Sequence, residues 1–220
     1  MLFDFDETLV NLDDFVDWEK AREAVVQAYL KGGIPNEIIM KYRSSVRMLS
    51  ELYEYVLRSY PHRVGNRIQN HASKALEKFE VQAAKKATLM PGAKDVLAWL
   101  RSKGVRIGIV SSNSPVAIEV ALTRLSIFRF VDAIVGREFP LKMKPNPDEF
   151  RHCLRKLRCT PREAVGVGDR TYDVIGAKEV GIFSVAITTG KSTKEELTRC
   201  EPDRVIGSLY EFQPIVGLLL

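Results

Sequence analysis

The sequence is short of cysteine and of long apolar runs, and both shortages narrow the classes of protein that it can encode. Its 220 residues include 3 cysteines, Cys153, Cys159 and Cys200, an odd number without CxxC spacing. That pattern argues against a disulfide framework and against a cysteine-bound zinc site. No apolar run approaches the roughly 18 residues of a membrane span, and no basic and apolar leader precedes residue 4. We therefore expect a soluble protein of the reducing cytoplasm, without a membrane partner.

Positive charge is confined to one block of the chain. Residues 18–90 hold 13 Lys and Arg against 7 Asp and Glu, whereas the rest of the chain is nearly neutral. Hydrophobic residues make up 45% of the sequence, which suffices for one core with an insertion or for two small domains. A basic block alone is a weak indication of nucleic-acid binding, so its meaning depends on the motifs around it.

The apolar periodicity changes near Met90. Before it, apolar residues recur at helical spacing, which predicts three helices, at Trp18–Tyr29, from Pro35 to Tyr60 and from His62 into Lys86. After it, short β-branched runs alternate with helical segments, a pattern typical of βαβ units and a parallel sheet. The expected strands are 105–110, 131–135, 164–167, 182–187 and 204–206, and the expected helices are 93–103, 115–125, 148–157 and 174–180.

Residues 2–6 form a first strand that is too short to stand alone. It must join the sheet made after residue 104, so the helical block becomes an insertion. We expect an α/β fold with a Rossmann-like parallel-sheet core of residues 1–12 and 89–220, and an α-helical cap domain of residues 13–88. Ligands of open parallel sheets bind beyond the carboxyl ends of the strands. Polar residues just past the strand ends are therefore the candidates for a site.

Acidic residues follow two of the predicted strands. Asp4 and Asp6 end the first strand, and Asp169 and Asp173 follow strand 164–167. Four carboxylates at one sheet edge would repel each other strongly unless a cation lay among them. Hard carboxylate oxygens favour Mg²⁺, which makes these four residues candidate metal ligands.

Hydroxyl and ammonium groups accompany the acids. Ser111 and Ser112 follow strand 105–110, and Lys144 lies in the loop after the third predicted strand. A lysine and a serine hydroxyl beside a metal are what the oxygens of a phosphoryl group require. Lys142 is a rival for Lys144, although the Lys-Pro-Asn-Pro context favours the latter.

In this order the motifs resemble those of the haloacid dehalogenase superfamily of phosphohydrolases, and phosphoglycolate phosphatases in particular. The resemblance rests on Asp4-Phe5-Asp6-Glu7-Thr8-Leu9, Ile109-Val110-Ser111, Lys144-Pro145, and Gly168-Asp169 with Asp173. It covers residues 1–12 and about 89–210. Residues 13–88 match the superfamily's cap only in position and helical character, and Glu7 replaces a more usual glycine.

The resemblance implies a mechanism. Asp4 would attack phosphorus and form an aspartyl-phosphate, while Asp6 would act as general acid and then as general base. Thr8 would hold Asp6 in position beside the phosphate. The implied Mg²⁺ ligands are the Asp4 carboxylate, the Asp6 backbone carbonyl and Asp169, with Asp173 close by. The implied phosphate-binding residues are Thr8, Ser111, Ser112 and Lys144.

Several of these residues also have purely structural readings. Ser111 could cap the following helix, and Asp173 could be an ordinary first-turn acid that stabilises a helix start. Arg170 is expected at the surface.

The cap should select the substrate. Arg43 with Arg47, and Arg63 with Arg67, are basic pairs at i, i+4 spacing, each predicted on one helical face. They could attract an anionic group or be ordinary solvated residues. We expect Mg²⁺-dependent hydrolysis of a small phosphorylated metabolite, such as phosphoglycolate or a sugar phosphate, by a monomer or homodimer.

Other activities of the same fold remain alternatives. A phosphomutase similar to β-phosphoglucomutase would use the same Asp6 and differ only in its product, whereas a dehalogenase has no use for Asp6 or a metal. Phosphonate hydrolysis would require a cap lysine, for which only the unremarkable Lys20 and Lys41 are available. A nucleic-acid-binding module with an idle core is a more distant alternative, and the complete catalytic set argues against it.

Overall fold

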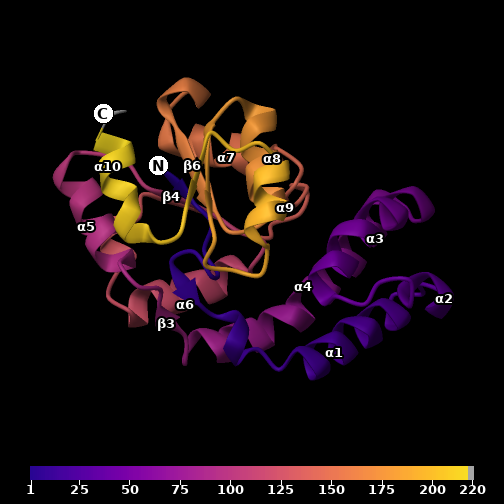
Figure 1. Ribbon diagram of the computed structural model, residues 1–220. Helices are drawn as coiled ribbons and strands as arrows, with labels where there is room; N and C mark the ends of the chain where they lie inside the picture. Colours follow the sequence, from indigo (N-terminus) through magenta and orange to yellow (C-terminus); the bar gives the residue numbers. More distant parts are fainter. Residues whose placement is uncertain (218–220) are drawn as a thin grey trace.

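The computed structural model describes residues 1–217 and shows a layered α/β core with a helical arm beside it (Figure 1). The core sheet has six strands in the order β5-β4-β1-β6-β7-β8, and every neighbouring pair is parallel. The strands are β1 (Leu2–Phe3), β4 (Gly108–Val110), β5 (Ala133–Val135), β6 (Val165–Gly168), β7 (Phe183–Ile187) and β8 (Arg204–Ile206). This confirms the predicted α/β fold with a Rossmann-like parallel sheet.

Both faces of the sheet are apolar, and helices cover both of them. Leu2 and Phe3 are fully buried, and since successive strand residues point to opposite faces they belong to different hydrophobic clusters. The covering helices are α5 (Ala93–Ser102), α6 (Pro115–Arg124), α7 (Asp148–Leu157), α8 (Thr171–Val180), α9 (Lys194–Arg199) and α10 (Phe212–Gly217). Short 3-10 segments lie at Asp13–Phe15, Phe128–Phe130, Pro161–Glu163 and Leu209–Glu211. All three cysteines are free.

The basic block forms an inserted helical region, as predicted. Its helices are α1 (Trp18–Lys31), α2 (Asn36–Ile39), α3 (Ser45–Ser59) and α4 (His62–Ala84). They lie between β2 (Val10–Asn11) and β3 (Thr88–Leu89), which pair antiparallel where the insertion leaves and rejoins the core. None of the helices in residues 1–217 combines the length and the apolar composition that crossing a bilayer requires.

The prediction of a single helix from Pro35 to Tyr60 was wrong, because the structure has two helices there. The chain leaves helical geometry after α2 and restarts at α3, where the Ser44 side chain accepts a hydrogen bond from Arg47 N at 3.4 Å. Arg22 of α1 stabilises the break, because its guanidinium donates to the carbonyl of Arg43 at 2.9 Å. Apolar periodicity could not reveal it, since the buried stripe continues on both sides.

Helix α4 joins the inserted region to the core without interruption. It is 23 residues long and packs on α1 and α3 at one end and on α6 of the core at the other (Figure 1). Each of these two regions contains a buried polar residue of α4, Gln69 in the first and Glu80 in the second. Gln69 Nε2 donates to Leu49 O of α3, whereas Glu80 contacts the core. The helix therefore connects the inserted region physically to the edge of the sheet.

Candidate active site

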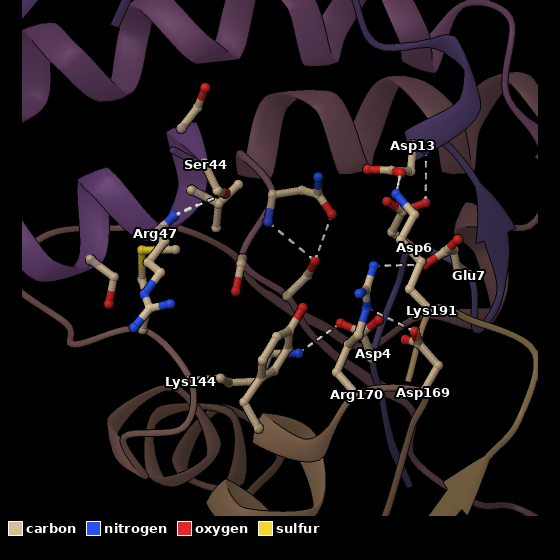
Figure 2. A pocket seen from close by; sticks show the side chains of 18 of the residues that line it. Asp4, Asp6, Glu7, Asp13, Ser44, Arg47, Lys144, Asp169, Arg170 and Lys191 are labelled. Carbon is tan, nitrogen blue, oxygen red and sulfur yellow. Dashed lines mark hydrogen bonds and ion pairs between the residues drawn. The ribbon is translucent and has the colours of Figure 1, made fainter. Parts of the chain in front are cut away.

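Asp4 lies at the centre of the sheet, immediately after β1. Its backbone N–H donates to Val167 O of β6 at 2.8 Å, so the chain stays paired as far as the carboxylate. β4 flanks β1 on the other side and carries Ser111 directly after its last residue. A cavity of about 630 Å³ lies between these strand ends and the inserted helices (Figure 2). The cavity is lined by many of the residues that the sequence predicted for a site, namely Asp4, Asp6, Arg43, Arg47, Ser111, Ser112, Lys144 and Asp169.

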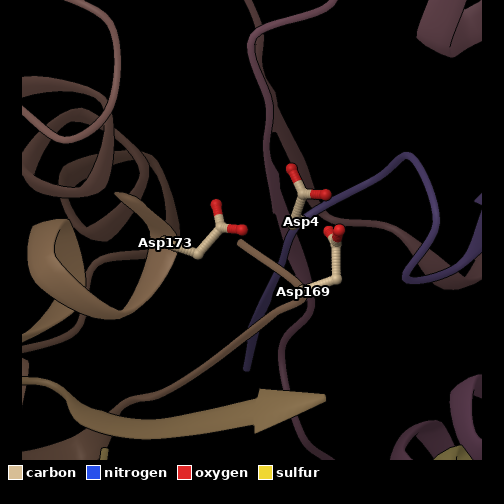
Figure 3. A group of neighbouring side chains, drawn as sticks. All are labelled: Asp4, Asp169 and Asp173. Atoms are coloured by element: carbon tan, nitrogen blue, oxygen red, sulfur yellow. The ribbon is translucent and has the colours of Figure 1, made fainter. Parts of the chain in front are cut away.

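Three acidic side chains lie next to one another beside this cavity (Figure 3). Asp4 and Asp169 line the cavity, whereas Asp173 does not. Carboxylate oxygens of Asp4, Asp169 and Asp173 lie within 4.8 Å of one another, and all three residues are buried. Burial, together with the neighbouring carboxylates, raises the pKa of Asp169 to about 9. Burial also raises the pKa of Asp173 to about 6, although Lys144 acts against it. Ionisation of all three carboxyl groups is therefore unfavourable without further positive charge among them.

The arrangement fits a divalent cation. Asp169 Oδ2 is a hard, buried oxygen that accepts no hydrogen bond, and Arg170 Nε lies 3.1 Å away as its ion-pair partner, so a cation would share this oxygen with the arginine. A Cβ on Gly190 would overlap this oxygen, so only glycine leaves it room. Asp4, Asp169 and Asp173 could therefore hold a metal ion. The Asp6 carboxylate is not part of this group, and the ligand that the resemblance implies for Asp6 is its backbone carbonyl.

Asp6 has a separate place in the cavity wall. Its Oδ1 accepts hydrogen bonds from Leu12 N at 2.8 Å and from Asp13 N at 3.0 Å. Burial raises the pKa of Asp6 to about 7, although the hydrogen bond from Leu12 acts in the opposite direction. The carboxyl group can therefore both hold and release a proton near neutral pH.

Thr8 lies elsewhere than the sequence suggested. Its fully buried hydroxyl donates to Asp169 Oδ1 at 3.4 Å, and it is not among the cavity-lining residues. The tight turn after Asp4, in which Leu9 N and Val10 N both bond to Phe5 O, places residue 8 against the loop after β6. Thr8 thus orients Asp169, whereas backbone N–H groups hold Asp6.

The serines after β4 face the cavity. Ser111 is buried, and its Oγ donates to Asn113 Oδ1 at 2.9 Å. Helix α6 is capped by Ser114, whose Oγ accepts from Ala117 N at 3.2 Å, and not by Ser111. The capping alternative for Ser111 is therefore excluded, and its hydroxyl lies where a phosphoryl oxygen could bind.

Lys144 reaches the acidic cluster and Lys142 does not. The buried Nζ of Lys144 donates to Asp4 Oδ1 at 2.6 Å and to Val110 O at 2.8 Å, and it also contacts Asp173. Burial alone would lower its pKa, but the two carboxylates raise the pKa well above the ordinary lysine value. Lys142 instead pairs at 2.6 Å with Glu54 of α3, outside the cluster. The structure thus separates the two candidate lysines.

Asp173 stabilises a helix start and also belongs to the acidic cluster. At the start of α8 its Oδ2 accepts from Arg170 N at 3.0 Å, which stabilises the first turn of the helix. Its other oxygen contacts Lys144 in the cluster. One carboxylate therefore fixes both the helix start and the buried lysine.

Glu149 of α7 supports the lysine from behind. Its Oε2 accepts from Lys144 N at 3.0 Å, whereas its buried Oε1 has no hydrogen-bond partner. Burial raises the pKa of Glu149 from the ordinary 4.5 to about 8. The folded protein therefore keeps a proton on this group at pH values where the unfolded chain has lost it.

This gives a pH-dependent prediction for Glu149→Gln. The stability that protonated Glu149 contributes is fully present below pH 4.5 and is lost as the pH rises through 8. Relative to the variant, the wild type should lose up to about 1.4 kcal/mol of unfolding free energy per pH unit in that window. Urea unfolding of both proteins at pH 5, 6.5 and 8 measures the difference. A difference independent of pH would contradict the assignment.

Arg170 was expected at the surface but belongs to the site. Its Nη2 pairs with Glu7 Oε2 at 2.8 Å, and its Nε lies 3.1 Å from Asp169 Oδ2 (Figure 2). Glu7 has a positive φ of 59°, and Thr189 Oγ1 donates to its carbonyl at 2.6 Å. In the sequence, the one indication of this ion pair is that Glu7 follows Asp6 and Arg170 follows Asp169, so residues of opposite charge stand next to two motif acids.

The two predicted arginine pairs have different locations. Arg43 and Arg47 both line the cavity, but Arg43 lies in the linker before α3, so they do not share one helical face. Arg63 and Arg67 line a separate depression along α4. Only the first pair therefore lies near the acidic cluster. No sequence motif indicated the other cavity-lining residues of the inserted region, which include Trp18, Arg22, Ser44, Ser45, Ser50 and Glu51.

Comparisons with known proteins agree with this geometry. A family model described as haloacid dehalogenase-like hydrolase matches residues 1–187. The glyceraldehyde 3-phosphate phosphatase of Pyrococcus abyssi is 31% identical over 205 residues, which cover 87% of this chain and 82% of that protein. The phosphoglycolate phosphatase of Escherichia coli K12 is 27% identical over 146 residues, which cover 66% of this chain and 58% of that protein.

A solved structure shares the fold over the whole length. The crystal structure of a predicted phosphatase from Clostridium acetobutylicum superimposes with a TM-score of 0.69 and covers 100% of this chain and 97% of its own. At 22% sequence identity, this similarity concerns the fold. It includes the inserted helical region as well as the sheet.

Proposed function

Because the chain belongs to the haloacid dehalogenase-like hydrolase family and is a phosphatase of that family, we propose that it is a Mg²⁺-dependent hydrolase of small phosphorylated metabolites. Glyceraldehyde 3-phosphate, phosphoglycolate and sugar phosphates are the proposed substrate class, by similarity to its relatives. The observation that carries the proposal is the buried contact between Lys144 and Asp4, beside Asp169, at the floor of a cavity.

Asp4 is the proposed nucleophile. Its carboxylate oxygen would form a bond to phosphorus as the bond to the leaving oxygen breaks, giving an aspartyl-phosphate that water then hydrolyses. Lys144 Nζ donates to Asp4 Oδ1 at 2.6 Å and so fixes the position of the carboxylate. Ser111 and Ser112 in the cavity wall would bind the phosphoryl oxygens.

Asp6 is the proposed general acid and base. In the first step its proton would go to the leaving oxygen, and in the second it would take a proton from the attacking water. A pKa raised to about 7 by burial suits both steps, because the group is half-protonated near neutral pH. The hydrogen bonds from Leu12 N and Asp13 N fix the orientation of its carboxyl group.

The metal would be held by Asp4, Asp169 and Asp173, and by similarity to the family also by the backbone carbonyl of Asp6. A bound Mg²⁺ supplies positive charge to the phosphoryl oxygens. Thr8 and Arg170 orient Asp169 from two sides. Their positions favour a preformed cluster over one assembled by the ion.

Hydrolysis of p-nitrophenyl phosphate with and without Mg²⁺ tests the proposal. We expect turnover that is abolished by chelation and restored by added Mg²⁺, because the ion would supply positive charge to the phosphoryl oxygens. Mg²⁺ at 100 times its Kd should also stabilise the fold by about 2.7 kcal/mol. Turnover unaffected by chelation would contradict the metal assignment. A panel of phosphorylated metabolites then identifies the substrate, and product analysis separates a phosphatase from a phosphomutase.

Arg47→Ala tests the cavity-lining arginines. We expect the KM for phosphoglycolate to rise about tenfold, because a charge-assisted hydrogen bond worth roughly 1.5–3 kcal/mol is lost. The KM for p-nitrophenyl phosphate, which has no second anionic group, should change little. Arg63→Ala is the matched control, since Arg63 lines a separate depression on α4. An equal effect of both variants would show that only overall charge matters.

A further inference from the structure

A buried ion pair outside the cavity joins α4 to the core. Arg137, which follows β5, donates through Nη1 to Glu80 Oε1 at 2.9 Å and through Nη2 to Glu80 Oε2 at 2.7 Å. Both side chains are fully buried. Neither residue is among those that line the cavity, so neither can touch a substrate there. The bidentate geometry gives the pair a single fixed orientation.

The pair holds the loop that follows β4 through backbone groups. Arg137 Nη1 donates to Ser112 O at 2.7 Å, and Arg137 N donates to Asn113 O at 2.8 Å. Glu80 Oε2 accepts from Ser114 N at 3.2 Å. The two charged residues thus contact three consecutive residues of one loop. These are the residues that connect β4 to α6.

The same network reaches the hydroxyl proposed to bind phosphate. Asn113 Nδ2 lies 3.4 Å from Glu80 Oε1, which only the amide nitrogen can approach as a donor. The carboxylate therefore fixes the amide orientation and turns Asn113 Oδ1 toward Ser111, whose Oγ donates to it at 2.9 Å. Asn113 N donates back to Ser111 Oγ at 3.2 Å. Glu80 of α4 thus contacts Asn113, and Asn113 contacts Ser111, the side chain proposed to bind phosphate.

Stability alone does not account for this pair. A buried ion pair pays a desolvation penalty that often equals or exceeds its attraction, and apolar residues of similar volume are frequently as stable. Apolar residues at positions 80 and 137 could not, however, bond to Ser112 O or Ser114 N. The hydrogen bonds to the loop are therefore what the pair provides that a hydrophobic contact would not.

We propose that Glu80 and Arg137 are positioning residues that hold residues 111–114 in the conformation that binds the phosphoryl group. The inference rests on the proposed phosphatase function. Because Glu80 belongs to α4, the inserted helical region takes part in phosphate binding from outside the cavity. A displacement of α4 would be transmitted to Ser111 through Asn113.

The test replaces both charges together, so that no unpaired charge stays buried. Glu80→Leu with Arg137→Met should fold, with a lower melting temperature because Ser112 O and Ser114 N lose their partners, but without the larger cost of an unpaired buried charge. The Ki of inorganic phosphate and the KM of p-nitrophenyl phosphate should each rise roughly 10- to 100-fold, because the loop is no longer held in place. Arg101→Gln is the control, because it removes the partly exposed pair with Asp132 and leaves the loop contacts intact.

A second variant displaces the loop without changing any charge. A Cβ on Gly136 would lie 2.6 Å from Asn113 O and 2.9 Å from Pro115 N, so Gly136→Ala must push the loop away. It should raise the same two constants, which keeps the proposal testable if the double variant does not fold. Folded variants that keep both constants within about twofold of the wild type would overturn the inference alone. A wild type that neither hydrolyses the substrate nor binds phosphate would overturn the proposed function as well.

Discussion

Asp4→Asn is expected to lower kcat by on the order of 10⁴-fold or more, because the amide cannot act as the nucleophile that forms the covalent intermediate. The substitution keeps the shape of the side chain. It also removes one of the three carboxylates that crowd the cluster, while Lys144 keeps its contact with Asp173. The folded structure should therefore persist while turnover is lost. Initial rates on p-nitrophenyl phosphate measure the effect.

A second acid separates loss of the nucleophile from general loss of charge. Asp13→Asn changes another acid of the cavity wall, one to which no chemical step is assigned, and should keep most of the turnover. Unfolding curves of both variants confirm that the comparison concerns folded protein. If Asp4→Asn retained more than about 1% of wild-type kcat, another residue would have to be the nucleophile.

Lys144→Met is expected to have the second-largest effect, on stability as well as on activity. Without the ammonium group, Asp4 and Asp173 keep their burial but lose their buried cation. Breaking such a pair costs about 3–5 kcal/mol. In a chain of this length that lowers the melting temperature by roughly 10 °C. Turnover should fall about 10³-fold, because the phosphoryl group loses its charged partner.

The pH dependence of this defect distinguishes charge from packing. Lys144 holds the pKa of Asp173 down against the effect of burial, so the pKa of this carboxyl rises when the lysine is removed. The variant should therefore be closest to wild-type stability at pH 5 and fall further behind as the pH rises to 8. Lys142→Met, which removes an exposed lysine of the same loop, is the control. An equal loss of stability at all pH values would point to packing instead.

Much of the core could be predicted because its signals are local. Strand 204–206 and helix 148–157 agree with β8 and α7, since a β-branched run and an apolar stripe each determine one element. The break before α3 was missed because it depends on Arg22, which lies on another helix and bonds to Arg43 O. Short, polar α9 was also missed, as it presents little periodicity.

Sequence order indicated the motif acids and Lys144, but it could not indicate contacts between charges far apart in the chain. Arg170 and Glu7 are separated by 163 positions and Arg137 and Glu80 by 57, yet both pairs are in direct contact. Charged residues are usually exposed, so nothing in the sequence distinguished these from surface residues. Their contacts result from the packing of separate elements around one sheet edge.

Trapping the covalent intermediate tests the central claim most directly. Wild-type protein is mixed with a ³²P-labelled substrate, quenched in acid within milliseconds, digested and mapped by mass spectrometry. The mechanism predicts an acid-stable acyl phosphate on the peptide that contains Asp4, and none in Asp4→Asn. A phosphoryl group on any other residue, or turnover without a trapped intermediate, would contradict nucleophilic attack by Asp4.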